Sequence, residues 1–360
     1  MVSSPKEASA LPVKEASMWE PLQDNLVRCK VCPHRCAIKP SARGICGTRE
    51  NKDGKLYTLI YGELTATAVD PIEKKPFFNF WPGSNSFSIS SVGCNLDCPW
   101  CQNFHISHAE PGDVFAEQMN PEKVVELAKK YGCRSISYTY NEPIIWFEYV
   151  LDTAKLAKRE GVLNCLVTNG YITLEALEEL GPYIDAANVD IKGFTEEFYR
   201  NYCKAKLEPI LEATTAMQKK GIHVEITTLL IPDLNDSGEE IARLSSWHKE
   251  NLGPDTPLHF SRYYPQFKFT QKPPTPVQRI EKAREIALKE GLHYVYTGNV
   301  PGDPGENTYC PSCKSLLVER YGYDIVKWNI TDRLECSTCG ARIAIKGKYE
   351  KRAPWSPVIA

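Results

Sequence analysis

Short apolar runs alternate with amphipathic segments through the middle of this 360-residue chain. Apolar runs of roughly four to eight residues between turn residues are typical of buried strands, and apolar positions three and four apart indicate helices. Strands are predicted at 87–92, 135–140, 163–168, 187–191, 224–231, 258–261 and 294–297. Helices are predicted at 121–130, 144–160, 174–180, 195–202, 207–220, 238–250 and 276–289. This order of βα units predicts an α/β fold with a parallel sheet and helices outside it.

The number of βα units fits a partial (β/α)6 barrel, in which chemistry is expected at the C-terminal ends of the strands. The predicted barrel spans residues 81–304. Residues 1–20 are small and polar and are predicted to be disordered. A cysteine-rich segment at 21–80 and a four-cysteine unit with a tail at 305–360 are predicted to flank the barrel.

The charge balance gives no reason to expect nucleic-acid binding, because 43 basic residues face 45 acidic ones for a net charge of −2. The first residues contain no apolar run of the kind that a secretion signal needs, and no stretch is long and apolar enough for a membrane span. We therefore expect no membrane partner and a reducing, cytoplasmic location in which cysteines stay unpaired.

Cysteine is the most informative residue type, with 14 in the chain. Eleven fall into three groups, and Cys133, Cys165 and Cys203 stand alone among apolar neighbours, which predicts inert core residues. The middle group is Cys94, Cys98 and Cys101, with C-x3-C-x2-C spacing directly after the strand at 87–92.

Three thiolates at this density predict an iron–sulfur cluster with one iron left open, because closed structural sites use four protein ligands. An open position can hold a substrate or cofactor. The alternatives are a structural zinc loop and a cluster completed by a distant cysteine.

The two flanking groups have four cysteines each. Cys310, Cys313, Cys336 and Cys339 form two C-x2-C pairs, which predicts a zinc ribbon or a rubredoxin-like knuckle holding zinc or iron, with zinc favoured. The N-terminal group follows C-x2-C-x3-C-x9-C and consists of Cys29, Cys32, Cys36 and Cys46. Its spacing fits zinc or an iron–sulfur cluster and does not choose between them.

Polar residues follow several predicted strands and are candidates for ligand binding at that edge of the sheet. They are Asn141, Glu142, Asn169, Asp190 and Lys192. The alternatives are a carboxylate at a helix N-terminus for Glu142, a common Asn-Gly turn for Asn169 and a structural ion pair for Asp190 and Lys192. On the substrate side we expect His259, Arg262 and Tyr263, with Asp70, Glu73, Lys74 and Lys75 at the same mouth.

The C-x3-C-x-aromatic-C spacing, with Trp100 at the aromatic position, resembles the radical S-adenosylmethionine (radical SAM) superfamily. Further motifs are CPHRC (32–36), GICG (44–47), DPIEKKP (70–76), CQN (101–103), YNEP (140–143), DIKGF (190–194) and GNVPG (298–302). Together they resemble the radical SAM enzyme of the AmmeMemoRadiSam system, which is related to pyruvate formate-lyase activating enzymes. The resemblance implies a radical SAM barrel, a [4Fe–4S] cluster, and cleavage of SAM to a 5'-deoxyadenosyl radical that abstracts hydrogen from a substrate.

The resemblance also implies roles for the strand-end residues. Glu142 and Asn141 occupy the place of a Gly-Gly-Glu-like turn that binds the methionine ammonium, although the glycines are absent. Asn169 is expected at the ribose or carboxylate, Lys192 of the Asp190-x-Lys192 motif at the carboxylate, and Trp100 near the adenine. Expected partners are a flavodoxin- or ferredoxin-like electron donor and proteins of the AMMECR and Memo types. A glycyl-radical-enzyme activase and a non-catalytic Fe–S or zinc scaffold remain alternative functions.

Overall fold

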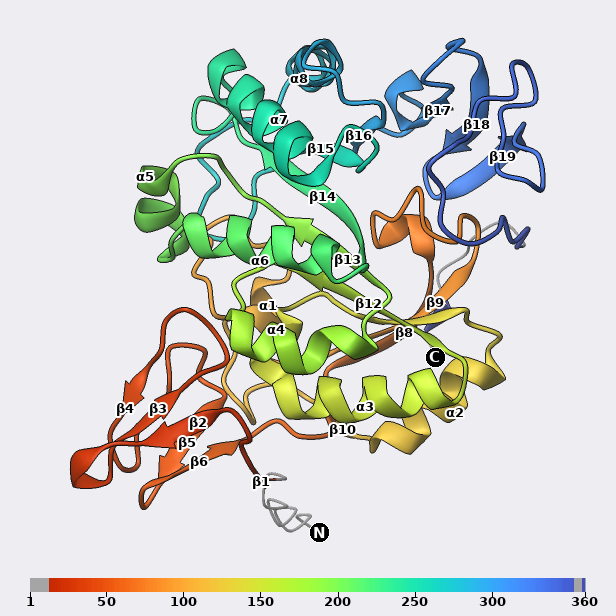
Figure 1. Cartoon of the computed structure of the whole chain (residues 1–360). Helices are drawn as coiled ribbons and strands as arrows, with labels where there is room; N and C mark the ends of the chain where they lie inside the picture. Colours follow the sequence, from red (N-terminus) through yellow and green to blue (C-terminus); the bar gives the residue numbers. More distant parts are fainter. Residues whose placement is uncertain (1–12, 353–357, 360) are drawn as a thin grey trace, which may run out of the picture.

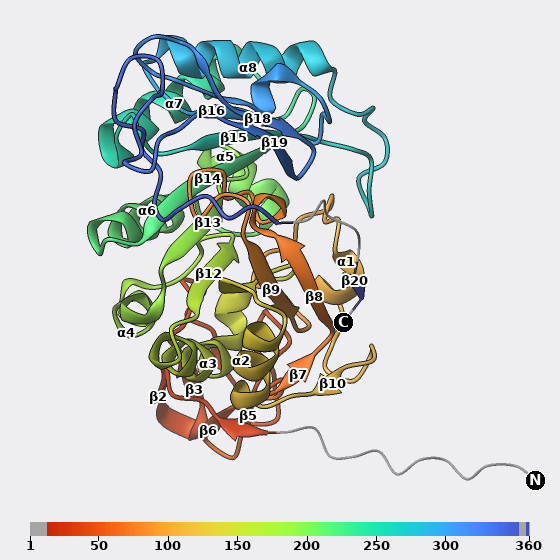
Figure 2. The same ribbon diagram turned by 90° about the vertical axis from the view of Figure 1, so that its right-hand side faces the viewer.

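A nine-stranded sheet forms the centre of the computed structural model, which describes residues 13–352 and 358–359 (Figures 1 and 2). The strand order is β16-β15-β14-β13-β12-β11-β9-β8-β20. The strands are β8 (Ala66–Pro71), β9 (Asn85–Ser90), β11 (Ser135–Tyr138), β12 (Leu163–Thr168), β13 (Ala186–Asp190), β14 (His223–Leu230), β15 (Leu258–Arg262), β16 (Val295–Gly298) and β20 (Val358–Ile359). The strands from β9 to β16 in this order are parallel to their neighbours, whereas β8 and β20 are antiparallel.

The predicted βα units are present, and their bounds differ by a few residues. The helices are α2 (Pro121–Lys130), α3 (Phe147–Arg159), α4 (Leu174–Leu180), α5 (Glu196–Phe198), α6 (Glu208–Lys219), α7 (Gly238–Leu252) and α8 (Val277–Lys289). The helices α2, α3, α4 and α6 lie along one face of the sheet (Figure 1). Caps explain several starts, because Asn120, Thr173 and Ser237 each accept a hydrogen bond from a backbone amide of the first turn.

Short irregular segments interrupt two predicted helices. The helix expected from residue 144 begins as the 3-10 turn Pro143–Trp146, and the one expected at 195–202 continues α5 as a π-helical turn, Tyr199–Cys203. Burial on both faces explains the apolar runs, since four of the five residues of β13 are buried.

The N-terminal unit consists of two small sheets that carry the first cysteine group. Its strands are β1 (Lys14–Glu15), β2 (Trp19–Pro21), β3 (Val27–Cys29), β4 (Ala37–Ile38), β5 (Arg49–Lys52) and β6 (Lys55–Thr58). The prediction of disorder for 1–20 is wrong for β1 and β2, because β1 pairs with β6 and β2 with β3. Residues 1–12 lie outside the described residues.

The C-terminal unit is a three-stranded sheet of β17 (Thr308–Tyr309), β18 (Leu316–Tyr321) and β19 (Asp324–Trp328). It shares a small apolar core with Phe78, Tyr294 and Tyr296 next to β16. The N-terminal and C-terminal units lie at opposite ends of the molecule (Figures 1 and 2). A two-stranded pair, β7 (Glu63–Leu64) with β10 (Glu117–Gln118), and the short helix α1 (Phe104–Ser107) complete the elements near the site. Within the described part of the chain, no helix has the length and apolar character needed to cross a membrane.

Candidate active site

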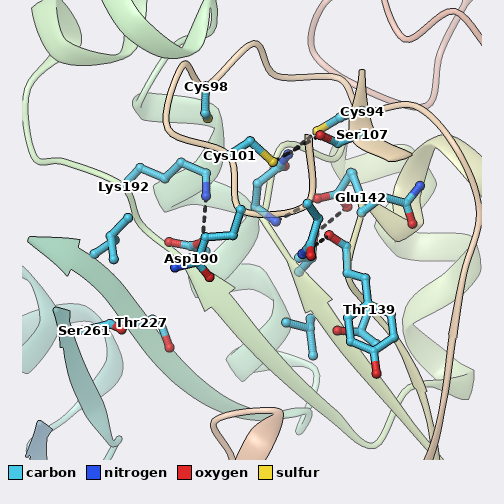
Figure 3. A pocket seen from close by; sticks show the side chains of 18 of the residues that line it. Cys94, Cys98, Cys101, Ser107, Thr139, Glu142, Asp190, Lys192, Thr227 and Ser261 are labelled. Atoms are coloured by element: carbon cyan, nitrogen blue, oxygen red, sulfur yellow. Dashed lines mark hydrogen bonds and ion pairs between the residues drawn. The ribbon is translucent and has the colours of Figure 1, made fainter. Parts of the chain in front are cut away.

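The middle cysteines lie on one loop directly after β9, at the C-terminal edge of the sheet (Figure 3). All three line a cavity of about 440 Å³ together with residues that follow β11, β12 and β13. The Cys94 thiol accepts hydrogen bonds from the Leu96 amide (3.4 Å) and the Asn169 side chain (3.9 Å), and the Cys101 thiol lies 3.1 Å from Ser107 Oγ. Burial raises the pKa of Cys94 and of Cys101. A bound metal would therefore be needed to hold both as thiolates.

The backbone before Cys94 is held from two sides. Gly93 has a φ of +85°, and a Cβ there would lie 2.6 Å from Thr48 Cγ2 and 2.7 Å from the Cys46 carbonyl oxygen. Asn141 donates to the Gly93 carbonyl (3.0 Å) and accepts from the Ser91 amide (3.2 Å). Asn141 therefore orients the cysteine loop, and only glycine fits where the N-terminal unit contacts it.

Cys203 is a cysteine that the sequence did not place near the site. Its buried thiol lies 3.8 Å from the Cys98 thiol, although 105 positions separate the two in the chain. Two thiolates on one tetrahedral zinc ion stand about 3.8 Å apart, given Zn–S distances of about 2.3 Å. Cys203 is therefore too close to Cys98 to ligate a neighbouring iron of the same cluster, and it is not among the residues that line the cavity.

Glu142 lies at the cavity wall and also caps the 3-10 turn that follows it. Its carboxylate accepts hydrogen bonds from the Ile144 amide (3.0 Å), the Thr168 hydroxyl (2.7 Å) and the Asn169 amide (2.8 Å). The side chain is only 3% exposed, so it is not the solvated carboxylate of the alternative interpretation. Burial raises the pKa of Glu142 to about 7, which a cation in the cavity would oppose.

Asn169 connects the third strand end to the cysteine loop. Its side-chain amide donates to Asn95 Oδ1 (2.8 Å), and its Oδ1 accepts from the Tyr171 amide (2.9 Å). Gly170 has a φ of +71°, and a Cβ there would lie 2.8 Å from Val189 Cγ1. Gly170 therefore allows the backbone to lie close to the neighbouring strand, β13.

Asp190 and Lys192 form the ion pair of the alternative interpretation, with Nζ 2.6 Å from Asp190 Oδ2 (Figure 3). Both line the cavity. Although burial opposes the charge, Asp190 and then the Cys98 thiolate raise the pKa of Lys192. Asp190 Oδ1 is buried and has no hydrogen-bond partner among the described residues. The pair thus leaves an acceptor and a cation beside the cavity.

Trp100 is 3% exposed and packs against Phe198, Tyr202 and Phe269, with ring centroids 5.5–5.8 Å apart. It shields the cysteine loop with its own aromatic cluster and still contributes to the cavity wall.

The residues expected on the substrate side divide into two sets. Lys74 and Lys75 line the cavity, and both pair with the buried Asp70, at 2.8 and 2.7 Å. The residues that do not line it are Asp70, Glu73, His259, Arg262 and Tyr263. Other groups hold four of these residues. His259 binds Glu225 (2.7 Å) and Glu73 accepts from the Gly83 amide (2.6 Å). Arg262 donates to the Thr275 carbonyl (2.7 Å), and Tyr263 donates to the Phe269 carbonyl. Sequence reasoning also missed Ser261, Asn299 and Tyr323, which line the cavity instead.

The four N-terminal thiols gather inside the N-terminal unit. Burial, and then the neighbouring Cys29 and Cys46 thiolates, raise the pKa of Cys32. His34, between Cys32 and Cys36 in the chain, donates from Nε2 to the Asn95 carbonyl of the cysteine loop (2.7 Å). The N-terminal group therefore sits against the loop that carries Cys94.

The four C-terminal thiols all lie within 4.8 Å of one another, and among the described residues only they bring three or more metal-ligating atoms so close. Cys310 is 3.6 Å from Cys339, and Cys313 is 3.7 Å from Cys336, sulfur to sulfur. Thiolates on one tetrahedral ion are spaced by about 3.8 Å. This group fits a single tetrahedral metal ion.

Comparison with known proteins agrees with this geometry. The sequence model of the Radical SAM superfamily matches residues 88–245, which include the middle cysteines and four strand ends of the cavity. The chain is 46% identical to "Uncharacterized protein MJ0808" of Methanocaldococcus jannaschii, over 92% of this chain and 99% of that protein. It is 27% identical to the "Putative glycyl-radical enzyme activating enzyme MJ1632" of the same organism, over 57% of this chain and 78% of that protein. It is 24% identical to the "Pyruvate formate-lyase 1-activating enzyme" of Escherichia coli, over 44% of this chain and 66% of that protein.

A radical SAM domain implies a [4Fe–4S] cluster and SAM. The donor set fits that cluster, because three thiols of one loop share a wall of the cavity and lie farther apart than ligands of a single ion. The chain therefore belongs to the radical SAM superfamily of enzymes, in one family with MJ0808 and related to the glycyl-radical activating enzymes.

Proposed function

We propose that this enzyme binds SAM at an open iron of a [4Fe–4S] cluster held by Cys94, Cys98 and Cys101, and that it abstracts hydrogen from a substrate in the same cavity. The observation that carries the proposal is that these three thiols share one cavity wall, while no other thiol of the described chain lines it. When bound, the cluster supplies the electron that splits SAM into methionine and a 5'-deoxyadenosyl radical.

The cavity residues are proposed to bind the parts of SAM by charge and shape. The Glu142 carboxylate suits the methionine ammonium, and the Lys192 ammonium suits the carboxylate. Asn169 can donate from its side-chain amide, and the unpaired oxygen of Asp190 can accept, at the ribose hydroxyls. Trp100 provides an apolar surface for the adenine. Burial of these groups strengthens each interaction and excludes water from a radical.

The opposite wall of the cavity is the proposed substrate side. We assign to it the lining residues Lys74, Lys75, Ser261, Asn299 and Tyr323. These polar groups suit a hydrogen-bonding substrate, free or attached to a partner protein. AMMECR-type and Memo-type proteins are the proposed partners, on the basis of the resemblance in sequence motifs.

The finer architecture is part of the same proposal. We propose that the parallel sheet is the partial barrel of radical SAM enzymes and that the C-terminal unit is a zinc ribbon. Sulfur–sulfur distances of 3.6 and 3.7 Å support a single tetrahedral ion there, and closed four-thiolate sites are typical of structural zinc.

An external one-electron donor of the flavodoxin or ferredoxin type is required, because SAM cleavage consumes an electron that the chain itself does not produce. All fourteen cysteines are free. This supports a reducing, cytoplasmic setting, in which unpaired thiols and clusters persist.

A second candidate is activation of a glycyl-radical enzyme, which the similarity to MJ1632 and to the Escherichia coli activating enzyme favours. It predicts a backbone radical, visible by EPR, on a glycyl-radical protein incubated with this enzyme and SAM. A non-catalytic scaffold predicts no SAM cleavage at all.

The test is 5'-deoxyadenosine formation by anaerobically reconstituted and reduced enzyme. We expect product from the wild type and from Cys203→Ala, and none from Cys98→Ala. Product from Cys98→Ala at the wild-type rate would contradict the assigned cluster ligands. Loss of product in a folded Cys203→Ala variant would contradict the assignment of Cys203 outside the catalytic machinery.

A further inference from the structure

We propose that Cys29, Cys32, Cys36 and Cys46 hold a second [4Fe–4S] cluster, which receives electrons at the surface and passes them to the cluster of the cysteine loop. This inference rests on the proposed function only in naming the cluster of the cysteine loop as the acceptor of the electron. The binding site itself stands on four observations within the N-terminal unit.

The first observation is the spacing of the thiols. The C-terminal four meet the 3.8 Å spacing of one tetrahedral ion, whereas no three of the N-terminal thiols come within 4.8 Å of one another in the described chain. Each iron of a [4Fe–4S] cluster carries one protein thiolate, so the thiols of a cluster stand farther apart than those of a single ion. The same wider spacing holds for Cys94, Cys98 and Cys101.

The second observation is a buried cation with free donors. Arg49 is 2% exposed, and one of its amino groups pairs with Glu148 at 2.5 Å. Its Nε and Nη1 are buried and have no hydrogen-bond partner among the described residues. The guanidinium interacts electrostatically with the Cys29 and Cys46 thiolates. Unpartnered N–H groups of a buried cation beside these thiols suit the sulfide and thiolate sulfurs of an anionic cluster and offset its charge.

The third observation is contact between the two cysteine groups. The Cys46 carbonyl is packed so closely on Gly93 that a Cβ would come within 2.7 Å of it. With standard backbone dimensions, this places the Cα atoms of Cys46 and Cys94 no more than about 11 Å apart. His34 adds a hydrogen bond from the N-terminal group to the Asn95 carbonyl of the loop. This contact is the proposed route of the electron from one cluster to the other.

The fourth observation is access from solvent. Cys32, Cys36 and Cys46 are partly exposed, and Ile45 next to the last of them is 65% exposed. A low-potential protein donor of the flavodoxin or ferredoxin class can therefore approach this cluster from outside. One electron from the donor reduces the N-terminal cluster from the 2+ to the 1+ state. When this electron moves on, the N-terminal cluster returns to the 2+ state and the loop cluster is reduced by one electron. No proton or bond change accompanies the transfer.

Metal and sulfide analysis tests the site without any turnover. In the triple variant Cys94→Ala, Cys98→Ala, Cys101→Ala the N-terminal group is intact, and we expect about four irons and four sulfides per chain to remain. Adding Cys32→Ser and Cys36→Ser should remove both, while Cys133→Ser, at a buried thiol outside the groups, should remove neither. The C-terminal group accounts for one zinc per chain in every variant. A second zinc in place of the iron of the triple variant, iron without sulfide, or the absence of both iron and sulfide would overturn the proposal.

EPR of the dithionite-reduced protein tests the proximity. The wild type should show two cluster signals that broaden each other and relax faster through spin coupling, and SAM should shift only one of them. The triple variant should show a single, uncoupled signal that SAM does not change. Two signals that do not interact would contradict the relay.

The route of the electrons is tested by comparing donors. We expect the ratio of 5'-deoxyadenosine formation driven by reduced flavodoxin to that driven by dithionite to fall at least about tenfold in Cys32→Ser/Cys36→Ser. An unchanged ratio would overturn the relay, whatever happens to the absolute rates. Absence of product from the wild type with both donors would count against the proposed function alone, because the iron, sulfide and EPR results do not depend on it.

Discussion

Gly93 is the residue on which the position of the cysteine loop depends most directly. Its φ of +85° and the 2.6 Å and 2.7 Å approaches of Thr48 and Cys46 leave no room for a side chain. Gly93→Ala should therefore lower the free energy of unfolding by about 2 kcal/mol or more and reduce the iron content. The control is Gly132→Ala, at a φ of +63° with nothing within 4 Å, which adds backbone strain without a clash. Equal effects of both changes on the melting temperature would contradict the contact.

Glu73 is a second single residue with a testable effect, because it makes the stability of the protein depend on pH. Burial raises the pKa of Glu73 from 4.5 to about 7. The folded state therefore binds the proton more tightly, and wild-type stability falls as pH rises from about 4.5 to 7. Glu73→Gln should gain stability relative to wild type between pH 5 and pH 8, by up to ~3 kcal/mol. The measurement is thermal unfolding at pH 5 and at pH 8, with Glu197→Gln at an exposed position as the control. A pH-independent difference would exclude the shift.

Some residues of the site could be predicted from the sequence, and others could not. Cys94 and Glu142 were identifiable because a short spacing or a strand end marks them, and both line the cavity. Cys203 and Tyr323 were not, because they reach the site through tertiary contacts that no local pattern encodes. His259 was misplaced because its strand was known but its buried partner Glu225 was not.

At the scale of elements, the regular βα units could be predicted and the irregular additions could not. Residues 163–168 have the predicted bounds, and four of the six residues are buried, as in a strand covered on both faces. β8 was not among the predicted strands, and it pairs antiparallel with both β9 and β20. The cysteine pairs predicted the C-terminal unit because two C-x2-C pairs are typical of a small unit held together by a metal ion.

That unit supports a prediction about metal removal. Cys336→Ser should abolish the metal of the C-terminal group and lower the melting temperature, because the ion is the main link among its loops. The iron of the cysteine loop should remain. Elemental analysis and thermal unfolding measure both, with Cys133→Ser as the matched control. An unchanged metal content would refute the site.

For the whole molecule, the buried ion pair between Arg49 of β5 and Glu148 of α3 joins the N-terminal unit to the sheet domain, at 2% and 4% exposure. Arg49→Met or Glu148→Gln alone should destabilise by about 3–5 kcal/mol, because each leaves a buried partner uncompensated. The double variant should lose less than the sum. The exposed pair Lys129 and Glu160, at 2.6 Å, is the control and should contribute no more than about 1 kcal/mol. Additive losses in denaturant unfolding would show that the pair does not couple the two parts.

The central claim is that three thiolates leave one iron of a cluster open to SAM. The most direct measurement is electron–nuclear double resonance on the reduced enzyme with SAM carrying 15N at the methionine amine. A coordinated amine predicts a strong 15N hyperfine coupling to the cluster, absent from Cys98→Ala. A wild-type cluster at full occupancy that shows no coupling in the presence of saturating SAM would contradict the account.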